Sequence, residues 1–280
     1  MSKVYKTVQG TPYLRDPEAV CIADSTFDFN SKAAAFLQDY DLEFDVGVED
    51  YTRACMSTDD PAVLSMFAGQ LCYLAFGNKR TSVADINKYM MNILASGHGS
   101  VLEHVNFTYL LYGIDRATTH ELVRHRVGFA VSQVSQRFVD ADRVRFVMPW
   151  EDRDEEGMAL FEKHIDRARQ EYEDRTSYLL RKFPRQEHET ATDHRKRIQS
   201  SARSVLPNDT EAPCVITINA RSARHMIALR TSPKADVRIR RPFIQILRDL
   251  QERSPVLFGD FVIQQLPDGS FGASTVYPKP

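Results

Sequence analysis

The chain has 280 residues, enough for one large domain or two smaller domains with a substantial hydrophobic core. Hydrophobic residues make up 42% of the sequence and charged residues 26%, which is typical of a globular enzyme. The formal net charge of -2 argues against a general nucleic-acid-binding protein, because such proteins normally carry a basic excess.

The four cysteines are widely scattered and form no CxxC pair: Cys21, Cys55, Cys72 and Cys214. This spacing excludes a zinc ribbon and offers no disulfide framework, so it favours a reducing compartment. The N-terminus lacks the apolar run of a signal peptide, and no stretch of the sequence reaches the length of a membrane span. We therefore expect a cytoplasmic protein that does not associate with membranes.

Residues 1–46 mix turn signals with one short helical stretch, and we predict that they form an extension packed on the main body, residues 47–280. A helix is predicted after Pro61, because polar residues precede this proline and apolar residues follow at helical spacing. A second helix should follow Ser82 and end near Gly97, which suits a C-cap.

The apolar period then changes. Alternation over residues 105–111 predicts a strand, residues 115–126 a helix, and the residues from there to Arg137 a loop. A long helix is predicted at 157–183, and a further helix ends at Leu206. A run of β-branched residues at 213–218 predicts a strand, which leads into a helix that ends at about residue 229. The last predicted helix covers residues 237–250. This order indicates an α+β fold in which long helices flank a few non-adjacent strands.

Several familiar motifs are absent: there is no GxGxxG, no GxxxxGK[ST] and no GxSxG. His120 and His125 suggest a zinc helix, but they are five residues apart instead of four, well over a quarter-turn from one another. We therefore expect no metal site. Cys214 follows a proline, but it lies in an apolar strand, where an inert buried thiol is expected.

The most informative segment contains Arg124, His125 and Arg126 in succession. Consecutive helical side chains point about 100° apart, so the three cannot serve one partner in the same way. Guanidinium groups here and at Arg137 match phosphates or the carbonyls of a flat ring. From the residues alone, a solvated basic helix end favoured by the helix dipole is an equally good interpretation.

The stretch from His120 to Arg126, followed by eight residues and then Ser135-Gln136-Arg137-Phe138, resembles the signature of flavin-dependent thymidylate synthases. Three further blocks resemble this family in the same order: Ser96 to Ser100 with Glu103-His104, Ala202 to Pro207, and Asn219 to Arg230. The resemblance implies a central, mostly antiparallel sheet flanked by long helices. It also implies active sites between the subunits of a homotetramer.

The resemblance further implies an enzyme that uses FAD, methylene-tetrahydrofolate and NADPH to methylate C5 of dUMP, giving dTMP, with no cysteine nucleophile. Residues 47–280 would then be the catalytic domain. Arg238, where the family usually has Glu, and the polar insertion at residues 185–195 depart from the common pattern. They leave open a relative that methylates UMP or dUMP for nucleoside-antibiotic biosynthesis. A nucleotide- or RNA-binding protein without catalysis is the alternative from another class.

Positions that match the family's motifs give the expected site. Arg230 matches the arginine that contacts the pyrimidine ring, and it is expected to be catalytic together with Ser135 and His98. The residues expected to bind the uridine nucleotide are Arg116, Glu121, Arg124, Gln133, Ser135, Arg137, Arg203 and Arg230. The residues expected to contact FAD are His98, Ser100, Arg124, His125, Arg126, Asn219, Arg221, His225 and Leu229.

Overall fold

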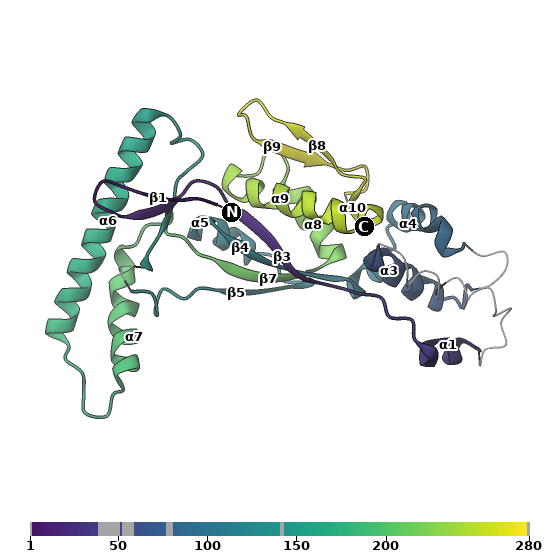
Figure 1. Cartoon of the computed structure of the whole chain (residues 1–280), viewed down its shortest axis with the longest axis horizontal. Helices are drawn as coiled ribbons and strands as arrows, with labels where there is room; N and C mark the ends of the chain where they lie inside the picture. The colour runs from purple at the N-terminus through teal and green to yellow at the C-terminus, as the bar shows by residue number, and fades with distance from the viewer. Residues whose placement is uncertain (1, 39–50, 52–58, 77–80, 141–142, 279–280) are drawn as a thin grey trace. The chain divides into compact units, whose positions relative to one another are not determined.

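The computed structural model describes residues 2–38, 51, 59–76, 81–140 and 143–278 (Figure 1). The chain divides into two compact units. Unit 1 comprises Met1–Ala19, Leu110–Arg124 and Val131–Val215, and unit 2 comprises Val20–Tyr109, His125–Ala130 and Ile216–Pro280. The predicted boundary between residues 46 and 47 lies outside the described residues.

Four strands form the main sheet, in the order β3 (Glu18–Asp24), β4 (Asn106–Tyr112), β7 (Cys214–Asn219) and β5 (Phe129–Gln133). Each strand contributes residues to both units. Hydrogen bonds at their ends show that β4–β7 and β7–β5 are antiparallel: Ala220 N to Val105 O, Ala212 N to Ile114 O, Asn219 N to Gly128 O, and Val134 N to Pro213 O. The predicted α+β fold with a mostly antiparallel central sheet is confirmed.

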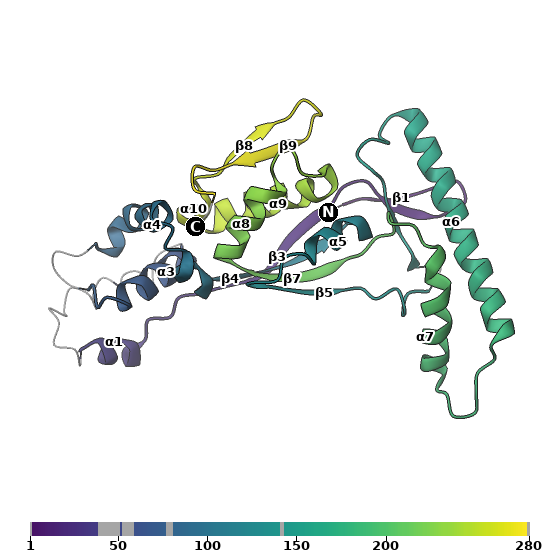
Figure 2. The same cartoon turned by 180° about the vertical axis from the view of Figure 1, so that it is seen from behind.

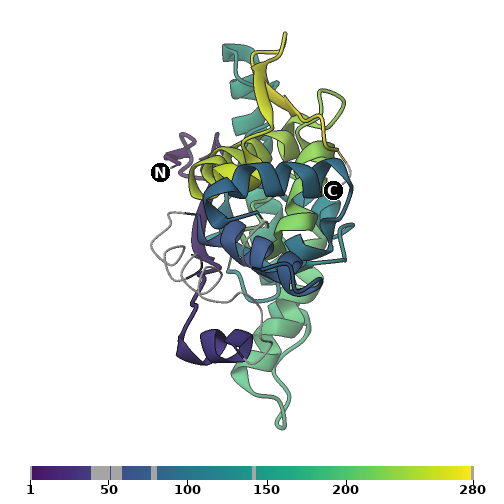
Figure 3. The ribbon, with the colours of Figure 1, turned by 90° about the vertical axis from the view of Figure 1, so that its right-hand side faces the viewer.

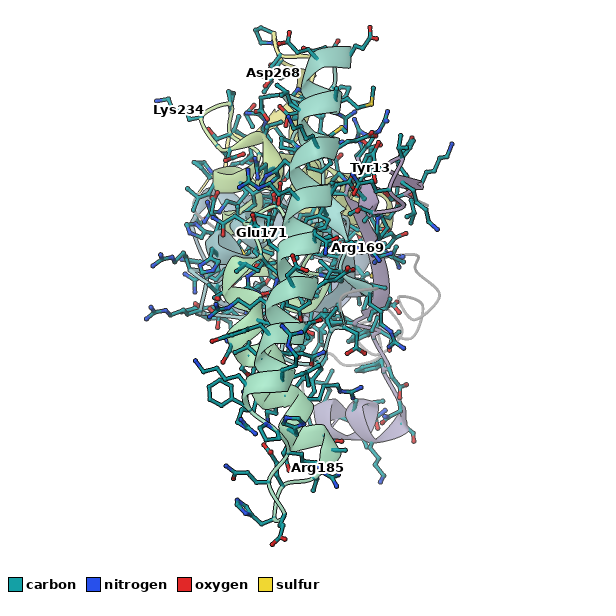
Figure 4. The ribbon with its side chains drawn as sticks, turned by 90° about the vertical axis from the view of Figure 1, so that its left-hand side faces the viewer. Tyr13, Arg169, Glu171, Arg185, Lys234 and Asp268 are labelled. Atoms are coloured by element: carbon teal, nitrogen blue, oxygen red, sulfur yellow. The ribbon has the colours of Figure 1, made fainter. Side chains whose placement is uncertain are left out.

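Unit 1 also contains a small sheet and two long helices that lie side by side (Figure 1). Its further elements are β1 (Val4–Lys6), β2 (Pro12–Leu14), α5 (Arg116–Leu122), β6 (Phe146–Val147), α6 (Glu155–Lys182), α7 (Ala191–Ala202) and η4 (Arg203–Val205). The helix predicted at 157–183 corresponds to α6, and apolar side chains along it are buried, as Phe161 and Tyr172 illustrate. In Figure 4, Tyr13 lies beside α6, where its hydroxyl donates to Glu162 at 2.6 Å, and Arg185 lies beyond the C-terminal end of the helix.

Unit 2 is mainly helical. Its elements are α1 (Ser31–Gln38), α3 (Asp60–Leu71), η1 (Val83–Asp85), α4 (Ile86–Ala95), η2 (Gly99–His104), α8 (Ala220–Arg230), α9 (Val237–Arg253), α10 (Pro255–Phe258), β8 (Val262–Gln265) and β9 (Phe271–Ser274). The β8–β9 hairpin packs on α9, which in turn packs on α8 (Figure 2). Figure 3 shows α3 and α4 lying beside one another at the end of this unit.

Local signals predicted most helix ends correctly. The carboxylate of Asp59 accepts a hydrogen bond from Ala62 N and caps α3, and Pro61 occupies its first turn. Among the described residues, no helix is long and apolar enough to cross a membrane.

Two predictions around the Arg-His-Arg segment are wrong. The helix predicted at 115–126 ends at Leu122, so Arg124, His125 and Arg126 lie outside it. The predicted loop before Arg137 contains strand β5. Both corrections have one cause: the chain after Leu122 extends along elements that come about a hundred residues later, and helix periodicity cannot register those contacts. The strands β1, β2 and β3 in the N-terminal segment and the β8–β9 hairpin were also not predicted.

Candidate functional site

The turn that ends α4 positions the first expected cofactor residue. Gly97 has a φ of +69°, which favours glycine. Its N–H donates to Leu94 O at 3.3 Å, and the N–H of His98 donates to Ile93 O at 3.1 Å. These two bonds form a Schellman C-cap, which confirms the predicted role of Gly97 and fixes the backbone of His98.

His98 and Ser100 line a cavity of about 310 Å³ in unit 2. The cavity is lined by Gly69, Cys72, Tyr73, Tyr89, Ile93, Gly97, His98, Gly99, Ser100, Val101 and Arg221. Glycines allow a flat ring to approach the backbone closely, and the tyrosine rings add apolar surface with polar tips. A cavity with this lining suits one part of a heteroaromatic cofactor.

Arg221 contributes a guanidinium to the cavity wall from the first turn of α8. Its Nη1 donates to Glu103 Oε1 at 2.6 Å, and both side chains are 44% exposed. The charge of Arg221 is therefore held at an accessible position, where it can meet an anionic or carbonyl group of a ligand.

A second group of expected site residues lies at the C-terminal end of α8. Arg230 Nε donates to His125 Nε2 at 3.1 Å. The rings of His125 and His225 meet edge to face, with centroids 6.2 Å apart. Burial, with the positive charge of Arg230 and the neighbouring His225, lowers the pKa of His125 to about 4. His125 is therefore neutral near pH 7, and because its Nε2 accepts, its proton lies on Nδ1.

The chain from His125 to Gly128, which we call the His125–Gly128 segment, runs along α8 from its last turn to its first. Ser222 Oγ donates to Val127 O at 2.7 Å, and Asn219 N donates to Gly128 O at 2.9 Å. Gly128 has a φ of +61°, and a Cβ at this position would lie 2.2 Å from Asn219 Nδ2. The segment therefore needs glycine at residue 128 to lie this close to the start of α8.

Asn219 was expected to contact FAD, and the structure gives its side chain a local role. Its Oδ1 accepts from Ser222 N at 2.8 Å and so caps α8. Arg126 and Leu229, two other expected cofactor residues, are exposed. Unit 2 thus brings together His98, Ser100 and Arg221 at one end of α8, and His125, His225 and Arg230 at the other.

Unit 1 brings together three of the residues expected to bind the nucleotide. Ser135 and Arg137 lie in one turn, where Arg137 N donates to Ser135 Oγ at 3.4 Å. Arg137 Nε donates to Ser200 Oγ on α7 at 2.9 Å. Arg203 follows three residues later, a spacing that places two residues on the same face of a helix. Ser135, Arg137 and Arg203 therefore gather near the C-terminal end of α7.

The other nucleotide residues are more dispersed. Arg116 begins α5, Glu121 lies in its last turn, Arg124 follows the helix and is exposed, and Gln133 ends β5.

The charges of unit 1 divide into two groups. Within the described ranges, the four arginines of unit 1 that are expected to bind the nucleotide have no carboxylate partner: Arg116, Arg124, Arg137 and Arg203. By contrast, Arg195 on α7 pairs with Asp140 at 3.8 Å and Arg197 with Glu189 at 2.9 Å. Cations without an acidic neighbour suit an anionic ligand such as a phosphate.

Two alternative chemistries receive no support. Cys214 is only 3% exposed, and burial raises the pKa of its thiol to about 12, which fits an inert cysteine. Among the residues that the structure describes, no three His, Cys, Asp or Glu side chains are arranged to hold a metal ion.

Sequence reasoning did not assign Tyr73 and Tyr89, which line the cavity. Tyr89 lies in the helix predicted after Ser82, and helical spacing alone cannot distinguish a core tyrosine from a cavity-lining one. The usable signal is the residue type, because tyrosine carries a polar tip that a fully apolar core does not require.

The α+β fold holds a glycine- and tyrosine-lined cavity and a neutral histidine that bonds an arginine. It also holds arginines that have no carboxylate partner among the described residues. These features suit a protein that binds a flat cofactor and an anionic ligand. The chain matches the family described as "Thymidylate synthase complementing protein" over residues 54–256. It is 42% identical over 217 residues to a flavin-dependent thymidylate synthase of Mycobacteroides abscessus, covering 76% of this chain and 84% of that one. It is 40% identical over 212 residues to a flavin-dependent thymidylate synthase of Corynebacterium glutamicum, covering 75% and 84%. The chain belongs to the flavin-dependent thymidylate synthase family.

A solved structure supports the fold. The UMP/dUMP methylase PolB from Streptomyces cacaoi, bound with 5-Br dUMP, superimposes with a TM-score of 0.58 at 18% sequence identity. The match covers 88% of this chain and 94% of that one. At this identity the likeness concerns the fold, and it agrees with the family membership.

Proposed function

We propose that this chain is an FAD-dependent enzyme that methylates C5 of dUMP to give dTMP, with methylene-tetrahydrofolate as carbon donor and NADPH as reductant. One observation carries the proposal beyond the family. Residues that the family's motifs assign to flavin and pyrimidine form two groups, one at each end of α8. One group lines the cavity beside Arg221, and the other contains the Arg230–His125 hydrogen bond. The chain's relatives at about 40% identity support dUMP as the nucleotide.

The residues present fit FAD. His98, Ser100 and Arg221 would hold one part of the cofactor in the cavity, since they supply donors beside glycines that admit a flat ring. His125, through its Nδ1 proton, would donate a hydrogen bond to a carbonyl or ring nitrogen. FAD supplies the redox chemistry of the reaction when it is bound.

Arg230 has the principal catalytic role in this proposal. C5 of uracil is a weak nucleophile, and negative charge builds on the ring carbonyls when it attacks. A guanidinium held in place before the reaction stabilises that charge best in a site shielded from water. The bond from Arg230 Nε to His125 holds the arginine in one orientation, so little reorganisation is needed.

The nucleotide phosphate would bind at Ser135, Arg137 and Arg203, near the end of α7. The Ser135 hydroxyl adds a donor, and the Arg137 guanidinium supplies charged donors in a planar fork. Arg116, Glu121, Arg124 and Gln133 complete the set by their match to the family's motifs. We keep residues 47–280 as the catalytic domain, and the family match over residues 54–256 lies inside this range.

We further propose that the enzyme acts in the cytoplasm as a homotetramer, with residues of different copies completing each active site. The support comes from β5, which lies at the edge of the main sheet. Val131, Val134 and Phe138, on this strand and just after it, are 37%, 45% and 49% exposed. Apolar side chains along an edge strand favour a partner surface. Light scattering coupled to gel filtration should give a mass of four chains.

The purified protein should be yellow or turn yellow on addition of FAD, and its flavin absorbance should bleach with NADPH. Addition of methylene-tetrahydrofolate and dUMP should then give dTMP, detected by chromatography. UMP is the matched control, because it differs only in the 2′-hydroxyl. Methylation of UMP at a rate comparable to dUMP would replace the proposed substrate. A colourless protein that cannot be reconstituted with FAD would overturn the proposal that the chain is an FAD-dependent enzyme. It would favour a nucleotide-binding protein without catalysis.

A further inference from the structure

Glu103 is the last residue but one of η2. It lies in one of the blocks that resemble the family, but neither the expected site residues nor the proposed chemistry gives it a role. Its Oε1 accepts a hydrogen bond from Arg221 Nη1 at 2.6 Å, across 118 residues of sequence. In the described part of the chain, neither of these two side chains has another polar partner. The contact therefore determines where the Arg221 guanidinium lies.

The backbone around this pair is fixed. Ala220 N donates to Val105 O at 2.9 Å, so the residue before Arg221 is bonded to the residue two places after Glu103. Leu102 and Ala220 are completely buried. The main chain thus holds the backbone of Glu103 close to the backbone of Arg221, which favours the ion pair between their side chains.

The two residues of the pair differ in their relation to the cavity. Arg221 lines the cavity and Glu103 does not. The carboxylate engages Nη1, which leaves Nε and Nη2 of the guanidinium for a second partner. We propose that Glu103 is a positioning residue, whose carboxylate holds the Arg221 guanidinium at the cavity wall so that its remaining donors meet an anionic or carbonyl group of FAD. The inference rests on the proposed function, because it takes FAD as the occupant of the cavity.

The sign of the effect on FAD affinity separates this role from a simple charge effect. A carboxylate near an anionic ligand would by itself weaken binding, so its removal would tighten the binding of FAD. A positioning carboxylate does the opposite, because an arginine that is already held loses less rotamer freedom when the ligand binds. The pair is exposed and should contribute little to folding stability.

The test measures the dissociation constant of FAD by equilibrium dialysis with the full-length chain. Glu103→Gln should raise this constant about 3- to 10-fold, as expected for loss of preorganisation of one charged hydrogen bond. Arg221→Gln should raise it at least as much, and the double variant should match Arg221→Gln alone. The control is Asp24→Asn, which breaks another exposed ion pair of unit 2, to Arg253 at 2.8 Å, and should leave FAD binding unchanged.

Unchanged or tighter FAD binding in Glu103→Gln overturns the inference. So does a full additional loss in the double variant, because Glu103 would then act without Arg221. A drop in melting temperature that accounts for the loss of FAD would show a structural role instead. The proposed function fails by a different result, namely that the unmodified chain itself does not bind FAD.

Discussion

The two groups of expected site residues are held in different ways. In unit 2, residues expected to contact FAD are fixed by contacts between distant segments: Arg230 bonds His125, and Arg221 bonds Glu103. In unit 1, the nucleotide arginines lie in turns or at element ends and have no carboxylate partner among the described residues, with Arg137 as an example. A flat, rigid ring system gains from a site formed in advance, whereas an anionic substrate gains from uncompensated charge. Under the proposed function, this difference predicts that unit 2 is preorganised for FAD and that unit 1 binds the nucleotide mainly through charge.

The largest expected effect comes from Arg230→Ala. Loss of a charged donor aimed at a developing negative charge should lower kcat/KM for dUMP about a hundredfold to a thousandfold. FAD should remain bound, because Arg221 lies nine residues earlier on α8, about 14 Å along the helix axis. Lys234→Ala, an exposed cation just beyond α8 that is labelled in Figure 4, is the matched control and should keep full activity. Loss of flavin together with activity would assign Arg230 to the cofactor instead.

Gly128→Ala should break the preorganisation of unit 2. The positive φ costs about 1–2 kcal/mol for a residue with a Cβ, and displacement of the Asn219 cap adds about 1 kcal/mol. Gly10→Ala is the matched control in unit 1, because Gly10 has a φ of +88° but a Cβ added there would meet no atom within 4 Å. Chemical denaturation should show the larger loss of unfolding free energy for Gly128→Ala. Equal losses in the two variants would mean that the close approach of residue 128 to Asn219 does not affect the free energy of unfolding.

These contacts also show what the sequence could reveal. Gly97 was predicted as a helix end because its signal is local: an apolar stripe stops and glycine follows. The end of α5 at Leu122 was not predicted, because it depends on Asn219 and Ser222, which hold the His125–Gly128 segment from about a hundred residues away. Family motifs indicated His98 in advance. The same block contains Glu103, but only the folded chain shows that its carboxylate bonds Arg221.

Arg137→Ala tests the nucleotide group. It should raise KM for dUMP about 10- to 30-fold through loss of a charged hydrogen bond, with FAD affinity unchanged. Arg195→Ala is the matched control on α7, since Arg195 already has Asp140 as its partner. A salt titration sharpens the result, because the KM of the unmodified enzyme should rise with ionic strength more steeply than that of Arg137→Ala. An equal rise in both would remove Arg137 from the phosphate site.

The smallest effect concerns the pH dependence of unit 2. The pKa of His125 is lowered to about 4 in the folded chain by burial, Arg230 and His225, whereas an unfolded histidine titrates near its ordinary value of about 6.5. The unfolded chain therefore binds more protons between these values, so the neutral His125 contributes fully above about pH 6.5 and the contribution is lost as the pH falls toward 4. Because His125 is only half-buried, we expect a loss of about 1 kcal/mol or less.

The measurement is the free energy of unfolding between pH 4 and 7 for the unmodified chain and for His125→Gln. The difference between the two curves isolates His125 from the other titrating groups. In Arg230→Gln the positive neighbour is removed, so the pKa of His125 should rise toward its ordinary value and the loss of stability on acidification should shrink. If the two curves stay parallel across this range, His125 is not held neutral by its surroundings. Unit 2 would then be no more preorganised around His125 than unit 1 is around its arginines.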